Sequence, residues 1–190
     1  MADQFSALRP QAAVILERAA GSFRTGEMAA AATLFRQIFA APPRFEQWTE
    51  ESALQHLQRL ADCGAQFFLV PAAPGSAELA ALSVGIDACQ HPSAAELISR
   101  GVGNSSYYFA ELAVAPAFRR YGLGSALQDV RERYGRDHGY DELSVRARAD
   151  NEVVLAMLYK RGFIEKSRYT TAIEGSLSER VVLTRSLMVR

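Results

Sequence analysis

Apolar residues recur three and four positions apart along four segments of the chain, and this spacing predicts four amphipathic helices. Thr25 and Thr49 are expected to cap the first two helices at their N-termini, with Ser52 just inside the second. Gly64 and Gly162 are expected to end two of the helices. The predicted helices cover residues 25–39, 49–63, 123–134 and 151–161.

Short runs rich in β-branched and aromatic residues predict strands. Residues 12–18 form an apolar run that periodicity alone does not assign, and we interpret it as a strand. Residues 87–106 contain Pro92, Gly101 and Gly103 and predict a long connection with a short helix at 93–100, or alternatively a mobile loop over a binding site. The other predicted strands cover residues 66–70, 78–86, 107–114, 141–147, 163–173 and 179–189.

Together these elements predict an α/β (α+β) fold, in which a mixed, twisted central sheet of about six to seven strands is flanked by about four helices. The chain has 190 residues, a length typical of one compact domain. It contains no internal repeat or low-complexity linker. We therefore expect a single domain over residues 1–190.

Charge and composition argue against several classes of function. Lysine and arginine total 21 residues and aspartate and glutamate 21, with no long block of one sign, so nothing predicts binding to nucleic acid or to an anionic membrane. No apolar run reaches the ~20 residues that cross a bilayer, and the first ten residues lack the pattern of a secretory signal. We expect a cytoplasmic protein whose two cysteines, Cys63 and Cys89, are buried free thiols.

The segment that follows residues 107–114 combines two arginines with two glycines at the point where a helix begins. It reads RRYGLG from Arg119 to Gly124, and the unpaired N–H groups of a helix N-terminus favour an anion such as a pyrophosphate. No lysine follows the glycines, which excludes a Walker A loop, and a dinucleotide-binding fingerprint meets Leu127 where it requires glycine or alanine. A tight turn without a ligand is the alternative.

Four signals follow one another in a fixed order along the second half of the chain. They are Leu112-Ala113-Val114-Ala115-Pro116, then Arg119-x-x-Gly122-x-Gly124, then Asn151, and finally Leu158-Tyr159-Lys160-Arg161-Gly162-Phe163. This pattern resembles the GNAT superfamily of N-acetyltransferases. The resemblance covers residues 107–165 best, and residues 39–51 are weakly similar to the N-terminal helices of some members. It implies the GNAT fold, acetyl-coenzyme A as cosubstrate and no metal.

The resemblance also assigns residues to the cofactor. The backbone of Leu112, Ala113 and Val114 would pair with the pantetheine arm as an added strand does, and an N–H group there would polarise the thioester carbonyl. Asn151 would bond the cofactor, and a plain N-cap is its alternative role. The turn that would bind the pyrophosphate, in which either arginine is alternatively only a solvated charge, comprises Arg119, Arg120, Tyr121, Gly122, Leu123, Gly124 and Ser125.

Two residues are candidates for the chemistry of acetyl transfer. By the resemblance, Tyr159 matches the family's general acid, and a phenol can donate its proton to the departing sulfur. The alternative is a tyrosine packed between helix and sheet. Glu111 lies in an apolar strand and would act as the base or attract the amine, or is alternatively a solvated charge. Strand alternation puts Glu111 and Ala113 on one face, so the reach of Glu111 to the substrate depends on a bulge.

The three histidines add little to this picture. His56, His91 and His138 lack the spacing of metal ligands and are expected at the surface, with His91 in the long connection as the one of possible interest.

The sequence thus predicts an N-acyltransferase that moves an acetyl group from acetyl-CoA directly to a primary amine, without a covalent enzyme intermediate. A small-molecule acceptor is expected ahead of a protein N-terminus or lysine, and the protein is expected as a monomer or homodimer. Two rival hypotheses stay open: a non-catalytic CoA-binding or regulatory module of the same fold, and a nicotinamide-dependent dehydrogenase.

Overall fold

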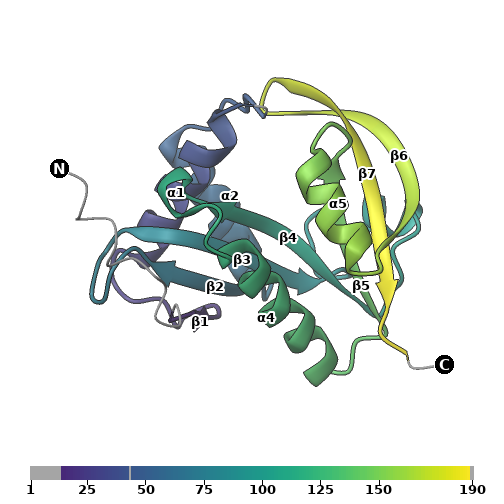
Figure 1. Cartoon of the computed structure of the whole chain (residues 1–190), viewed down its shortest axis with the longest axis horizontal. Coiled ribbons are helices and arrows are strands. Elements are labelled where there is room, and N and C mark those ends of the chain that lie inside the picture. The colour runs from purple at the N-terminus through teal and green to yellow at the C-terminus, as the bar shows by residue number, and fades with distance from the viewer. Residues whose placement is uncertain (1–13, 43, 189–190) are drawn as a thin grey trace.

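The computed structural model describes residues 14–42 and 44–188, which form one seven-stranded mixed sheet surrounded by helices (Figure 1). The strand order is β1-β2-β3-β4-β5-β7-β6, and every neighbouring pair is antiparallel except β4 and β5. This confirms the predicted mixed α/β architecture. The strands are β1 (Leu16–Arg18), β2 (Gln66–Pro71), β3 (Leu79–Asp87), β4 (Ser106–Val114), β5 (Glu142–Arg148), β6 (Ile164–Ile173) and β7 (Ser176–Ser186).

The helices begin and end close to the predicted positions, with one cap different from the prediction. Thr49 caps α2 as predicted, since its side chain accepts a hydrogen bond from Ser52 N and its own N–H donates to the Ser52 hydroxyl. The prediction of Thr25 as cap is wrong, because Gly26 takes the left-handed conformation (φ 83°) at the N-cap of α1. Among the described residues the helices are α1 (Glu27–Ala40), α2 (Glu50–Asp62), α3 (Ala94–Ser99), α4 (Leu123–Asp137), α5 (Glu152–Lys160) and the short 3₁₀ helix η1 (Pro116–Phe118).

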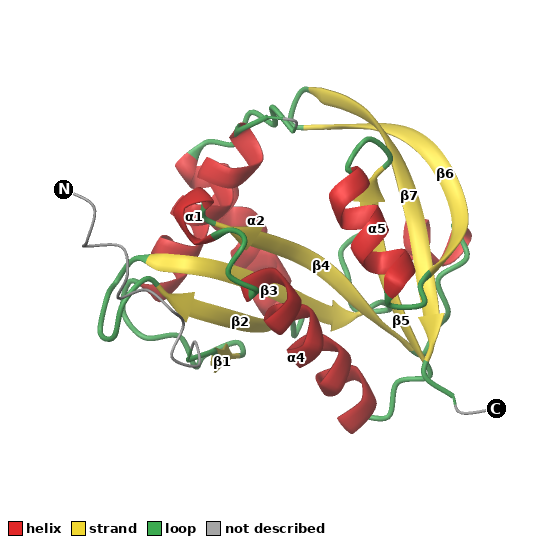
Figure 2. Ribbon diagram, viewed as in Figure 1, coloured by secondary structure: helices red, strands yellow, loops and turns green. Residues whose placement is uncertain are grey.

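Helices cover both faces of the β2–β4 part of the sheet. Alternate residues of β2 separate the two sides: Phe67 and Leu69 pack in the cluster with α1 and α2, whereas Phe68 and Val70 pack with Leu127 of α4. Figure 2 shows α4 crossing in front of these strands. The continuous apolar run of β2 is therefore explained by burial on both faces.

A second apolar cluster joins α5 to the other half of the sheet. Leu155 and Leu158 of α5 pack against side chains of β5 and β7, together with Phe163. Phe109 of β4 belongs to the same cluster. The two halves of the sheet are therefore packed by different helices and share contacts near the start of β4.

The two halves separate beyond a short parallel pairing. β4 and β5 pair only from Ser106 with Glu142 to Phe109 with Val145, and Figure 1 shows β4 and β5 diverging beyond that end. On its other side β4 has a bulge, because Gly85 faces Phe109 whereas Val84 faces Glu111. The segment of β4 from residue 110 to 114 therefore has an edge that β5 does not cover.

Most remaining expectations about the chain agree with the structure. The run at 12–18 does contain β1, although residues 12 and 13 lie outside the described residues, and α3 confirms the short helix in the connection after β3. Both cysteines are free as predicted, but Cys63 is half-buried and Cys89 is exposed, so the expectation of buried thiols is wrong. Within the described residues, no helix has the length and hydropathy needed to cross a membrane.

Substitution of Gly85 by alanine is predicted to destabilise the protein by about 1–3 kcal/mol. A Cβ at this position would overlap the phenol ring of Tyr107, and stacking against Tyr134 and Tyr140 limits the movement of that ring. Denaturant unfolding measures the change. Gly124→Ala is the control, because its Cβ meets open space within the first turn of α4; equal stability of the two variants would contradict the prediction.

Candidate functional site

A cavity of about 220 Å³ is lined by residues of α1, α2 and their connection, by the connection that follows β3, and by residues of the strands β4, β5 and β7. Its lining is unusually polar for an interior space, with four arginines, two glutamates and two histidines. The aromatic rings of Phe35, Phe39, Trp48 and Tyr108 complete most of its wall. A cavity of this composition favours a small polar ligand.

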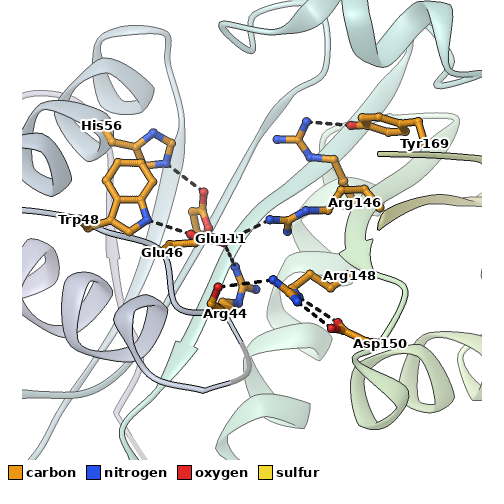
Figure 3. A network of polar contacts seen from close by, with 10 residues as sticks. Arg44, Glu46, Trp48, His56, Glu111, Arg146, Arg148, Asp150 and Tyr169 are labelled. Atoms are coloured by element: carbon orange, nitrogen blue, oxygen red, sulfur yellow. Dashed lines mark hydrogen bonds and ion pairs between the residues drawn. The ribbon is translucent and has the colours of Figure 1, made fainter. Parts of the chain in front are cut away.

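Glu111 enters this cavity because of the bulge in β4. Without a bulge, Ala110 and Glu111 would point to opposite faces of the sheet. In the structure both line the cavity, and Glu111 Oε1 lies 2.9 Å from His56 Nε2 of α2 (Figure 3). The side chain of Glu111 is only 14% exposed, so it is not the solvated surface charge that was one of its alternatives.

Aromatic side chains fix the position of His56. Its ring lies 5.3 Å from that of Phe35 and 5.1 Å from that of Trp48, measured between centroids. Phe35 also contacts Trp48 edge-on at 5.1 Å. This packing directs Nε2 at Glu111 while the carboxylate can still accept further hydrogen bonds in the cavity.

The environment of Glu111 favours its ionised form. Burial raises the pKa of the carboxyl, but the hydrogen bond from His56 and the charges of His56, Arg44 and Arg146 outweigh burial and hold the pKa below its ordinary value of 4.5. Glu111 is therefore a carboxylate at neutral pH. Since a carboxylate only accepts hydrogen bonds, Nε2 of His56 carries the hydrogen between them.

The second carboxylate of the cavity, Glu46, is held by a different set of partners. It is buried at 2% exposure; Oε1 lies 3.2 Å from Arg180 Nη2 of β7 and 3.6 Å from Arg44, and Oε2 accepts from Trp48 Nε1 at 2.8 Å (Figure 3). Gln47 N also donates to Glu174 O in the β6–β7 turn. These contacts attach the α1–α2 connection to the β6–β7 hairpin.

Arg146 and His91 form the part of the wall beside β5. Arg146 donates from Nη1 to the hydroxyl of Tyr169 at 2.9 Å (Figure 3). It also lies 3.5 Å from Glu96. Nδ1 of His91 accepts from Ser93 N. Burial and the charge of Arg146 lower the pKa of His91 to about 4, so this ring is neutral at physiological pH.

A buried arginine supports the backbone of Glu111 from the opposite side of the sheet. Arg131 of α4 is 2% exposed and donates from Nη1 to Glu111 O at 3.1 Å. Its guanidinium also bonds Gln128 and lies 4.3 Å from the centre of the Phe109 ring. Burial lowers the pKa of Arg131 to about 9. Arg131 thus pairs one carbonyl at the segment of β4 that β5 leaves uncovered.

The predicted anion-binding turn has the backbone geometry of such a site. Arg120 (φ 70°) and Gly122 (φ 83°) are both left-handed, and the first intrahelical bond of α4 comes from Ala126 N to Gly122 O. The amides of residues 123–125 therefore precede the ladder of α4 and have no acceptor within the helix. Tyr121 is exposed. Arg119 Nε donates to Val114 O at 3.1 Å and so closes the turn onto the end of β4.

The remaining predicted site residues lie on α5, outside the cavity wall. Asn151 is the N-cap of α5 and accepts from Val154 N at 3.3 Å, as its alternative role required. Tyr159 is 44% exposed and its hydroxyl donates to Glu165 at 3.4 Å, so it is not packed between helix and sheet. Arg161 bonds Ser125 O and Asp129, which brings the end of α5 beside the first turns of α4.

A sequence model of the acetyltransferase (GNAT) family matches residues 35–163, more than half of the chain. The chain belongs to this family. No curated protein matches the sequence.

Solved structures with the same fold are distant in sequence. The ribosomal-protein-S18-alanine N-acetyltransferase from Escherichia coli is 18% identical, with a TM-score of 0.63 over 93% of this chain and 96% of that one. A ribosomal-protein-alanine N-acetyltransferase from Brucella melitensis is 14% identical, with a TM-score of 0.66 over 90% of this chain and 99% of that one. A chain of the NatC complex bound to Gag peptide and CoA is 17% identical, with a TM-score of 0.62 over 92% of this chain and 99% of that one. These likenesses confirm the GNAT fold.

For this GNAT protein, the expectation that its histidines are surface residues is wrong at two positions. His56 and His91 line the cavity, while His138 is exposed and bonds Tyr134 O. Sequence reasoning also missed Arg146, although its place among the polar residues that alternate with Leu143 and Val145 was a usable signal. The described part of the chain contains no group of three or more His, Cys, Asp and Glu residues suited to a metal ion.

Glu111→Gln is predicted to make the stability of this GNAT protein less sensitive to acid. The folded pKa of Glu111 lies below its unfolded value, so the carboxylate stabilises the fold above about pH 4.5, and this contribution is lost as the pH falls through the folded pKa. Denaturant unfolding between pH 6 and pH 3 should therefore show that the free energy of unfolding falls less steeply in the variant than in the wild type. Glu51→Gln on the exposed side of α2 is the control; parallel curves for wild type and Glu111→Gln would refute the assignment.

Proposed function

We propose that this GNAT protein is an N-acyltransferase that moves an acetyl group from acetyl-CoA to the primary amine of a small molecule. The observation that carries the proposal is the ionised carboxylate of Glu111, held by His56 at the wall of a cavity and placed on β4 just beyond its separation from β5. An anion at this position attracts an ammonium group to the uncovered edge of β4.

Acetyl-CoA would bind on the α4 side of β4. The amides of residues 120–125 would hold the pyrophosphate, assisted by the positive end of α4, and Asn151 would add a hydrogen bond. The uncovered backbone of residues 112–114 would pair with the pantetheine arm. The left-handed Arg120 and Gly122 support this assignment, because adjoining amides in such turns converge on anions.

The reaction needs no covalent enzyme intermediate. The neutral amine nitrogen would attack the thioester carbonyl carbon, the nitrogen would lose one proton to water, and the C–S bond would break as Tyr159 donates its proton to the departing thiolate. Tyr159 would then recover a proton from water. A backbone N–H of residues 112–114 would stabilise the negative charge that develops on the carbonyl oxygen. Since the pKa of Glu111 is lowered, we favour Glu111 as the residue that binds and positions the ammonium, which would lose a first proton to water before the neutral amine attacks.

The cavity also supports a small acceptor ahead of a protein one. Its volume of about 220 Å³ and its polar wall suit a compact molecule. The structural neighbours named for ribosomal-protein alanine share 14–18% identity with this chain. At that distance their likeness concerns the fold, so it does not favour a protein N-terminus here.

Acetyl-CoA is predicted to raise the melting temperature, and nicotinamide cofactors are not. Thiol release with a panel of amines should then reveal turnover. Glu111→Gln is expected to lower kcat/KM about 10- to 100-fold, mainly through KM, because a charge-assisted hydrogen bond to the amine is lost. Glu51→Gln should behave as wild type. Stabilisation by acetyl-CoA without turnover on any amine would instead favour a non-catalytic CoA-binding module.

Tyr159→Phe tests the proposed general acid. Loss of a proton donor to the departing thiolate is expected to lower kcat about 100-fold while KM changes little. The control is Tyr140→Phe, since Tyr140 packs in the apolar cluster of α5 and lies outside the cavity wall. An undiminished kcat in Tyr159→Phe would remove this residue from the mechanism and leave its hydrogen bond to Glu165 as its role.

A further inference from the structure

We propose that the acceptor amine also carries an anionic group, which Arg146 binds with help from Arg59, so that the preferred substrate is an amino-acid-like molecule. This inference rests on the proposed function and names its substrate class. Glu111 would take the ammonium group, and the arginine side of the same cavity would take the carboxylate.

The charge of the cavity wall carries the inference. Four arginines and two glutamates line it, and Glu96 lies within ion-pair distance of one of these arginines, Arg146, so four positive charges face three negative ones before either histidine is counted. A plain amine enters the site as a cation, and a polyamine enters with several charges. Both are disfavoured in a partly desolvated cavity of net positive charge, whereas an added anionic group removes the penalty.

One of the two glutamates is already neutralised within the protein. Both oxygens of Glu46 are occupied, Oε1 by Arg180 and Arg44 and Oε2 by Trp48. Glu46 therefore offers little to a second ammonium group. Glu111 is the carboxylate of this wall that is left to bind one amine.

Arg146 retains donors for a ligand. Its ion pair with Glu96 and its hydrogen bond to Tyr169 both use Nη1, whereas its Nη2 makes no hydrogen bond or ion pair with any residue that the structure describes. The side chain is 18% exposed and lines the cavity. A guanidinium held at one corner can bind a carboxylate through its remaining N–H groups.

Arg59 and His91 extend this side of the cavity. Arg59 lies one turn after His56 on α2, is exposed, and lines the same space. His91 is neutral and accepts from Ser93 N at Nδ1, so its hydrogen is on Nε2. His91 therefore adds a donor without adding charge.

The test compares each of the common amino acids with its carboxamide and with its decarboxylated amine in the thiol-release assay. The best amino acid is expected to exceed both analogues at least about tenfold in kcat/KM, the effect of one charge-assisted hydrogen bond. A wild-type protein that acetylates the carboxamide or the decarboxylated amine equally well would overturn the inference while leaving the proposed function intact.

Arg146→Gln is expected to bring the ratio of kcat/KM for the amino acid to kcat/KM for its carboxamide close to one, because only acetylation of the amino acid becomes slower. Arg146→Lys should restore part of this ratio. Arg133→Gln, on the exposed side of α4, is the control. Melting temperatures of all variants check folding. An equal loss on amino acid and carboxamide in Arg146→Gln, with Arg146→Lys giving no selective recovery, would overturn the role of Arg146 in anion binding.

Calorimetric titration separates the two proposals if no amine is acetylated. Tighter binding of an amino acid than of its carboxamide, lost in Arg146→Gln, would then support the ligand class although the proposed function had failed. Equal or undetectable binding of both would overturn the inference as well.

Discussion

Parallel strands β4 and β5 share hydrogen bonds over four residue pairs and then separate, and the bulge at Ala110 falls where they part. Backbone groups on the uncovered edge of β4 need other partners, because an unpaired buried amide or carbonyl is costly. Arg131 supplies one of them from α4 by bonding Glu111 O. The same bulge turns the side chain of Glu111 toward His56. One local irregularity thus positions the backbone edge and the cavity carboxylate together.

The polar groups around the cavity are ordered by apolar neighbours as much as by charge. Phe35 and Trp48 fix the ring of His56, and Phe109 lies beside the guanidinium of Arg131. Burying these charges is unfavourable unless each finds a partner, and the ion pairs and hydrogen bonds of Glu46 and Glu111 meet that condition. Side chains held in place by such contacts can bind a ligand with little rearrangement.

The sequence predicted the elements well because they follow from local rules. The helical spacing, the Thr49–Ser52 capping box and Gly162 after α5 each act within a few residues. The family and its fold were also predictable, because the motifs from Leu112 to Phe163 lie in one stretch. The roles of Tyr159 and of the turn, and the single domain over 1–190, stay predictions. The partners of Glu111 were not predictable: His56 is 55 positions away, and no local pattern marks it.

The contact between Glu46 and Arg180 joins residues 134 positions apart, and Arg180 lies on β7, which inserts between β5 and β6. Chains are synthesised from the N-terminus, so α1, α2 and the connection that carries Trp48 emerge long before β7. Until β7 inserts, Glu46 lacks its buried cationic partner, and the cavity wall on that side is incomplete. The cavity therefore reaches its full shape only once the β6–β7 hairpin has docked beside β5.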